Sequence, residues 1–148
     1  MLPSLYSNET LLFSLIFIFN FWSDYMLFEL EKTFRFEAGH VLIHHDGKCR
    51  NPHGHSYVLS VILRAEKLIS SGPKSNMVID FNDLSSIVIP MIETYLDHQW
   101  LNDTLKCEST TVEFIAKWIF EYLEPQLPPL YAITLYETHS SKVTYRKS

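Results

Sequence analysis

Apolar and polar residues alternate along the first part of the chain that shows a regular pattern. The apolar positions of this segment are Phe28, Leu30, Phe34, Phe36 and Ala38, with charged or polar residues between most of them. A period of two is typical of a half-buried β-strand. A polar loop with Cys49 follows, and a second alternating segment runs roughly from His55 to Glu66. The pattern predicts two strands joined by this loop.

The next regular segment repeats apolar residues at helical spacing. Its apolar side is formed by Leu84, Ile87, Val88, Met91, Ile92 and Tyr95. This spacing predicts an amphipathic helix, and Asn82 or Asp83 is expected to cap its start. Pro90 lies inside the segment, so we expect a kink or an early end there.

A second helix is marked by Thr110-Thr111-Val112-Glu113, which fits a capping box. Its expected buried stripe is Val112, Ile115, Ala116, Ile119 and Leu123. After three prolines, two further strands are expected at Tyr131 to Thr138 and Lys142 to Lys147, around a turn at His139-Ser140-Ser141. The predicted order is ββααββ in one α+β domain.

Composition narrows the class of protein. A chain of 148 residues with 47% apolar residues has enough material for one domain with a sizeable core. The net charge of -5 provides no basic surface of the kind that nucleic-acid binding requires. Cys49 and Cys107 are too few for a disulfide framework. They could still pair with each other, but a reduced thiol in the cytoplasm is the preferred interpretation.

Residues 1–25 differ from the rest of the chain. Leu11 to Trp22 is nearly all apolar, yet it is shorter than the roughly 20 residues of a membrane span. It also lacks the preceding Lys or Arg and the following Ala-x-Ala site of a signal peptide. We therefore expect Met26 to be the functional start and residues 26–148 to be the domain. A membrane anchor is the alternative.

Three histidines share the apolar side of the two predicted strands. His53 and His55 are two residues apart, so their side chains leave an extended strand on the same face. His40 continues the core-facing positions of the first strand. Three histidine ligands would leave one position of a tetrahedral zinc ion open, which is the catalytic arrangement. A His-x-His pair alone is a weak signal, and His44, His45 and His139 are interpreted as loop residues.

Two other places carry candidate chemistry. Asp97-His98 offers a carboxylate that could orient an imidazole for proton transfer, although an ordinary loop pair is the alternative. Glu137 lies near the end of an apolar strand, on the same side as Leu135. It is either solvated at the strand end or bound to a cationic or amidine-like ligand edge.

Taken together, these segments resemble the 6-pyruvoyl-tetrahydropterin synthase and 6-carboxy-tetrahydropterin synthase family. The matching pieces occur in the family's order and are Phe36-Glu37-Ala38-Gly39-His40, Gly47 through Tyr57, Met77-Val78-Ile79-Asp80-Phe81, Leu96-Asp97-His98, Thr110-Thr111-Val112-Glu113 and Tyr136-Glu137-Thr138. Gly39 replaces a more usual Ala, and Phe114 stands where Asn is common. Neither difference removes a reactive group, and residues 1–25 lie outside the resemblance.

The resemblance implies a tunnelling fold, in which ββααββ subunits with a four-stranded antiparallel sheet and two helices assemble as a homohexamer made of two trimers. It implies zinc held by His40, His53 and His55, a general base at Cys49, and a relay of Asp97 and His98. It further implies that Glu137, Thr110 and Thr111 contact a pterin substrate.

The spacing of Cys49 and His53 distinguishes the branches of this family. Three residues intervene, as in the 6-carboxy branch of queuosine and deazapurine synthesis, whereas the biopterin branch typically has a longer insertion. The expected substrate is 7,8-dihydroneopterin triphosphate. The alternatives are the 6-pyruvoyl reaction, a zinc-dependent pterin-binding protein without turnover, and a structural zinc module. The cations that could hold the triphosphate are Lys48, Arg50, Arg64, Lys74, Lys142 and Arg146.

Overall fold

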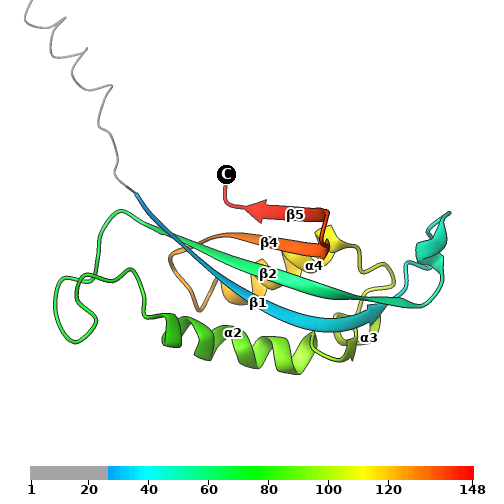
Figure 1. Ribbon diagram of the computed structural model, residues 1–148, viewed down its shortest axis with the longest axis horizontal. Helices are drawn as coiled ribbons and strands as arrows, with labels where there is room; N and C mark the ends of the chain where they lie inside the picture. Colours follow the sequence, from blue (N-terminus) through cyan, green and yellow to red (C-terminus); the bar gives the residue numbers. More distant parts are fainter. Residues whose placement is uncertain (1–26) are drawn as a thin grey trace, which may run out of the picture.

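A computed structural model describes residues 27–148 (Figure 1). The expected start at Met26 and the apolar run from Leu11 to Trp22 lie outside the described residues. Two long antiparallel strands, β1 (Phe28–His40) and β2 (His53–Ala65), form the centre of the sheet. β4 (Leu130–Thr138) pairs with β2, and β5 (Ser141–Arg146) pairs with β4 through a tight turn. The four predicted strands are all present.

A fifth strand corrects the predicted sheet. β3 (Gln99–Trp100) pairs with β1 in parallel, so the sheet is mixed and has the order β3-β1-β2-β4-β5. The expected sheet of four antiparallel strands was therefore incomplete. A strand of two residues is too short to leave an alternating pattern in the sequence, which is why the pattern did not reveal it.

The helices also differ from the prediction, because residues 27–148 form three α-helices rather than two. α2 (Phe81–Tyr95) and α4 (Val112–Leu123) are the expected pair, and α3 (Leu101–Thr104) is a single additional turn. Buried side chains of α2 and α4 join those of β1, β2 and β4 in one hydrophobic cluster. The helices therefore pack on the face of the sheet that carries Phe36 and Tyr57.

Both helix starts lie one or more residues away from the expected caps. Asp80, not Asn82 or Asp83, caps α2, because its side chain accepts a hydrogen bond from the Asn82 amide. Pro90 lies inside α2, which continues to Tyr95 rather than ending early. In α4 the cap is Thr111 rather than Thr110, so the predicted capping box is wrong. Thr110 is released from capping and is buried.

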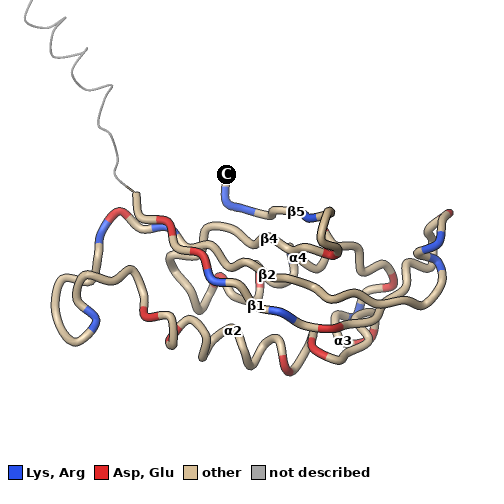
Figure 2. Tube along the Cα trace, in the orientation of Figure 1, with Lys and Arg blue, Asp and Glu red and all other residues tan. Residues whose placement is uncertain are grey.

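Charged residues of both signs lie along β1, whereas the charged residues of α2 are all acidic (Figure 2). None of the helices within residues 27–148 is long and apolar enough to span a membrane.

Candidate metal centre and adjoining groups

The three candidate histidines meet at one end of the β1–β2 ladder. His40, the last residue of β1, lies opposite His53, the first residue of β2. His55 lies opposite Ala38, and the same face continues to Tyr57. Directly opposed residues of an antiparallel pair point to the same side of the sheet. The register therefore gathers three imidazoles where the apolar face ends.

Their nitrogen atoms are close enough to share one ion. One ligand atom from each ring lies within 4.8 Å of the other two. The Nε2 atoms of His40 and His53 are 3.1 Å apart. The Nδ1 of His40 contacts the carbonyl of Thr110 at 2.8 Å, and the Nδ1 of His53 contacts the carbonyl of Asn51 at 2.7 Å.

These two carbonyls decide where the ring hydrogens lie. A carbonyl oxygen only accepts, so in each contact the Nδ1 carries the hydrogen and donates it. In neutral rings the two facing Nε2 atoms are then both acceptors, and they repel each other at 3.1 Å unless a cation or proton lies between them. Backbone acceptors that fix the tautomer of a histidine are the usual outer partners of a metal ligand.

Burial favours the neutral, metal-binding form of two of the three rings. Burial lowers the pKa of His40, although its hydrogen bond to the Thr110 carbonyl opposes the shift. Burial also lowers the pKa of His55, against the opposing charge of Glu137. Within the described residues the buried Nε2 of His55 has no hydrogen-bond partner. Neutral imidazoles with free nitrogens fit a metal ion, so these three histidines could hold one.

Glu137 lies beside the histidines rather than at an isolated strand end. The β4–β5 pairing shifts register around this residue, between Tyr136 and Thr138. Its Oε1 is 3.7 Å from the Nε2 of His55 and 3.8 Å from that of His40. The same residue also borders a cavity of about 460 Å³. A carboxylate between an imidazole cluster and a cavity is placed to face a bound molecule.

Asp97 and His98 form the predicted pair, directly before β3 and beside β1. Asp97 Oδ2 lies 2.9 Å from the Nδ1 of His98, and Asp97 Oδ1 accepts from the Glu37 amide at 2.9 Å. That hydrogen bond from Glu37, together with His98, lowers the pKa of Asp97. His98 itself has a φ of 56°, a left-handed conformation that is uncommon outside glycine. Its ring is 78% exposed, so the pair presents an imidazole to solvent.

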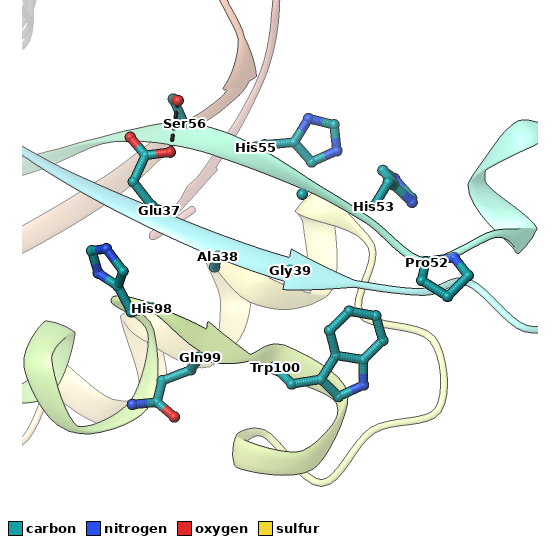
Figure 3. Close-up of a pocket in the computed structure, with 11 residues that line it drawn as sticks. Glu37, Ala38, Gly39, Pro52, His53, His55, Ser56, His98, Gln99 and Trp100 are labelled. Atoms are coloured by element: carbon teal, nitrogen blue, oxygen red, sulfur yellow. Dashed lines mark hydrogen bonds between the residues drawn. The ribbon is translucent and has the colours of Figure 1, made fainter.

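A cavity of about 710 Å³ lies between this pair and the start of β2 (Figure 3). His98 and Trp100 line one part of it, and Pro52, His53 and His55 line another. The rings of His53 and His55 stand on β2, while His98 and Trp100 stand on the other side of β1 in Figure 3. His98 therefore borders the same cavity as His53 and His55, whereas Asp97 and His40 do not line it.

Cys49 lies on the short helix η1 (Lys48–Arg50), in the loop between β1 and β2. Its side chain is half-buried, and its sulfur does not belong to the group of ligand atoms that the three histidines form. Cys49 and Cys107 are both free thiols, so the alternative of a disulfide between them is wrong. His44, His45 and His139 are exposed and lie outside the strands and helices, as expected.

Sequence patterns did not identify Tyr57 and Asn102 as residues near the cluster, and they gave Thr110 a different role. The backbone carbonyl of Thr110 accepts a hydrogen bond from the His40 ring, and a pattern of side chains cannot reveal a backbone contact of this kind. Tyr57 is fully buried, and among the described residues its hydroxyl has no hydrogen-bond partner. Burial and the Glu137 carboxylate raise its pKa. Tyr57 could have been found, because it shares the face of His53 and His55. Asn102, described below, left no signal in the sequence.

Comparison with known proteins gives a consistent picture. A family model described as 6-pyruvoyl tetrahydropterin synthase matches residues 29–148. A 6-carboxy-5,6,7,8-tetrahydropterin synthase from Synechocystis sp. is 44% identical over 115 residues, covering 77% of this chain and 89% of that protein. The protein of the same name from Haemophilus influenzae is 38% identical over 143 residues, covering 82% of this chain and 100% of that protein.

The other branch is also represented among the similar proteins. The 6-pyruvoyl tetrahydrobiopterin synthase of Dictyostelium discoideum is 36% identical over 104 residues, covering 68% of this chain and 74% of that protein. The structure of 6-pyruvoyl tetrahydropterin synthase from Caenorhabditis elegans superposes with a TM-score of 0.71 at 31% identity. It covers 83% of this chain and 97% of that chain. The predicted tunnelling fold agrees with this neighbour.

Proposed function

Because the chain belongs to the 6-pyruvoyl tetrahydropterin synthase family, we propose that it is a zinc-dependent 6-carboxy-5,6,7,8-tetrahydropterin synthase. Its substrate would be 7,8-dihydroneopterin triphosphate, and its products 6-carboxy-tetrahydropterin, acetaldehyde and triphosphate, a step of queuosine and deazapurine synthesis. The observation that carries the proposal is the cluster of His40, His53 and His55, with only three residues between Cys49 and His53. Relatives named for the 6-carboxy reaction, at 44% and 38% identity, support this branch.

The histidine cluster would hold the metal through three imidazole nitrogens. Zinc bound there would polarise a hydroxyl or carbonyl oxygen of the substrate side chain. The chain's own contribution is to favour the neutral form of His40 and His55 by burial, which lowers the pKa of both, and to fix His40 and His53 through the carbonyls of Thr110 and Asn51. These features suit a metal that must remain bound while the substrate changes.

Glu137 would hold the pterin ring. The 2-amino-4-oxo edge of a pterin presents two N–H donors side by side, which one carboxylate can accept in a bidentate manner. A ring held in this way would lie next to the histidines, since Glu137 is within 3.8 Å of two of them. We also assign a substrate contact to Thr110 and Thr111, although their known bonds are to His40 and to the start of α4.

Cys49 would be the general base, and Asp97 with His98 would be the proton relay. The Asp97 carboxylate orients the His98 ring at 2.9 Å and is itself fixed by the Glu37 amide. An oriented imidazole facing a cavity can accept a proton and return it. Lys48 and Arg50 flank Cys49 and are exposed, so they are the cations that we propose for the triphosphate.

The principal alternative is the 6-pyruvoyl reaction, which starts from the same substrate and does not break a carbon-carbon bond. The Dictyostelium relative favours it at 36% identity. A pterin-binding protein without turnover would not need Cys49 or the Asp97–His98 pair. A structural zinc module would be expected to close its site with a fourth ligand, whereas the cluster contains three.

We further propose a homohexamer in the cytoplasm. β5 is an edge strand of the sheet, and an exposed edge is a template for pairing with another chain. The two free cysteines are compatible with a reducing compartment. Light scattering coupled to gel filtration would measure the mass of the assembly.

Product analysis tests the reaction. The purified protein is incubated with zinc and dihydroneopterin triphosphate, without nicotinamide or flavin, and the products are identified by mass spectrometry. We expect acetaldehyde and 6-carboxy-tetrahydropterin in equal amounts. Dominant 6-pyruvoyl-tetrahydropterin without acetaldehyde would instead establish the alternative, and unchanged substrate would favour a binding protein.

A further inference from the structure

We propose that Asn102 is a positioning residue for the metal centre, because its side chain fixes the orientation of His40 through the two segments that meet at this ring. The proposal rests on the proposed metal-binding function. Asn102 lies on α3, outside the histidine cluster and outside the cavity that adjoins it. It would act through the backbone around His40 rather than by contact with metal or substrate.

The carboxamide of Asn102 has both halves engaged with backbone groups. Its Oδ1 accepts from the amide of Val41 at 2.9 Å, and its Nδ2 donates to the carbonyl of the same residue at 2.9 Å. The Nδ2 also lies 3.1 Å from the carbonyls of Cys107 and Glu108. A carboxamide offers a donor and an acceptor side by side. It therefore bonds to the backbone N–H and C=O of Val41 in the way that a neighbouring β-strand would.

These partners are the immediate neighbours of the His40 hydrogen bond. Val41 follows His40 directly, and the segment of Cys107 and Glu108 leads to Thr110. The carbonyl of Thr110 accepts from the Nδ1 of His40 at 2.8 Å. Asn102 therefore connects the donor strand and the acceptor segment of the bond that sets the tautomer of His40. Without it, the two segments would still be joined by an isolated backbone bridge between Leu42 and Ser109.

Loss of this connection should change the ring that binds the metal. His40 is fully buried, so it cannot recruit water freely if the Thr110 carbonyl moves away. Its Nε2 would then be directed less well towards the shared position with His53, from which it is 3.1 Å away. Removal of such an outer partner of a metal ligand typically weakens metal affinity about 10- to 100-fold.

The first experiment compares Asn102→Ala with Thr104→Ala in the full-length protein. Thr104 is a matched control, because it lies on the same helix and its hydroxyl donates to the Tyr95 carbonyl at 2.7 Å, away from the histidines. Zinc affinity is measured by competition with a chromophoric chelator. We expect Asn102→Ala to lose about 10-fold or more, and Thr104→Ala to bind zinc as the wild type does. Equal affinities in both variants would overturn the proposal.

A second measurement reads the His40 hydrogen bond without metal. In zinc-free protein labelled with ¹⁵N, the Nδ1 proton of His40 should give a slowly exchanging resonance, because it is buried and bonded to a carbonyl. It should exchange faster with solvent in Asn102→Ala than in Thr104→Ala. Unchanged exchange would contradict the proposal. If wild-type protein binds no zinc, the metal function fails, while this readout still decides the role of Asn102.

A third variant covers the case in which Asn102→Ala does not fold. Asn102→Ser keeps a shorter donor and acceptor, and it should give an intermediate loss of zinc affinity and intermediate exchange. A folded Asn102→Ser protein with wild-type values for both would overturn the proposal. Failure of both Asn102 variants to fold would also overturn it, because Asn102 would then be required for folding rather than for the orientation of His40.

Discussion

The histidine cluster differs from the rim groups, which are Cys49, Asp97 and His98, in burial and in the elements that position it. His40 is fully buried at the end of the core face, and the other two histidines of the cluster come from β2. His98 is 78% exposed, and Cys49 lies on a short helix within a loop. The cluster is complete within one chain, whereas Cys49 and the Asp97–His98 pair do not contact it.

From this difference we expect the proposed metal binding and the proposed proton transfer to be separable. Strand register brings the three imidazoles together, and the backbone carbonyls of Thr110 and Asn51 then orient two of the rings. The rim groups depend on local backbone conformation, including the left-handed φ of His98. Changes to the cluster should therefore remove metal, whereas changes at the rim should leave the metal in place and alter turnover.

The largest expected effect is the loss of metal from the cluster. His53→Ala or His55→Ala leaves two imidazoles, which cannot hold a tetrahedral ion tightly. We expect about one zinc per chain in the wild type, and little zinc and no turnover in either variant. Elemental analysis of the purified proteins measures this. His44→Ala is the control, since His44 is an exposed loop residue. Full zinc occupancy in both cluster variants would contradict the assignment.

A smaller effect is expected at Glu137, between the two regions. Glu137→Gln replaces one acceptor oxygen by a donor that would face the N–H groups of the pterin. Hydrogen bonds to a charged group contribute about 1.5–3 kcal/mol, so affinity should fall roughly 10- to 100-fold. Equilibrium dialysis with dihydroneopterin triphosphate measures the change. Glu113→Gln is the control, because Glu113 is exposed in the first turn of α4. Unchanged affinity would remove Glu137 from the site.

The sequence predicted the cluster better than it predicted the helix starts. The shared parity of His40, His53 and His55 follows from strand alternation, which survives in any register that keeps the core inside. The structure therefore places these residues together as expected. Glu137 was recognised as a candidate for a similar reason, because it lies on the face of Leu135.

Features that depend on local competition were not predictable. Thr110 and Thr111 are both good capping residues, and only the structure shows that Thr111 caps α4 while Thr110 is buried beside His40. Asp80 competes with Asn82 and Asp83 in the same way at α2. β3 is two residues long, so it carries no periodic signal, and its parallel pairing with β1 fixes the place of His98. Tertiary contacts decided each of these cases.

A moderate effect is expected for the two opposed glycines beside the cluster. A Cβ at Gly54 would lie 2.8 Å from the backbone oxygen of Ala38, which cannot move without disturbing the ladder. A Cβ at Gly39 would lie 3.0 Å from ring carbons of Trp100, a side chain that can shift. Gly54→Ala should therefore lower the free energy of unfolding by about 1–3 kcal/mol and Gly39→Ala by less. Urea denaturation compares them, and the reverse order would contradict this account.

The smallest effect concerns the charge of Asp97. Its folded-state pKa is below the ordinary value of 3.8, so the stability that it contributes is present above that pH and is lost as the pH falls through the folded value. Because the carboxylate is 34% exposed, solvent screening keeps this contribution below about 1 kcal/mol. Asp97→Asn should be slightly less stable than wild type near neutral pH, and the difference should shrink in acid. A difference that grows on acidification would reverse the sign.

The separation of metal binding from chemistry is tested most directly by Cys49→Ala. Zinc content, pterin affinity and turnover are measured on the same preparation, with Cys107→Ala as the control for a half-buried thiol elsewhere. We predict wild-type zinc and pterin binding, with turnover reduced about 10²- to 10⁴-fold, the usual contribution of a general base. Near wild-type turnover, or loss of zinc together with turnover, would contradict the account.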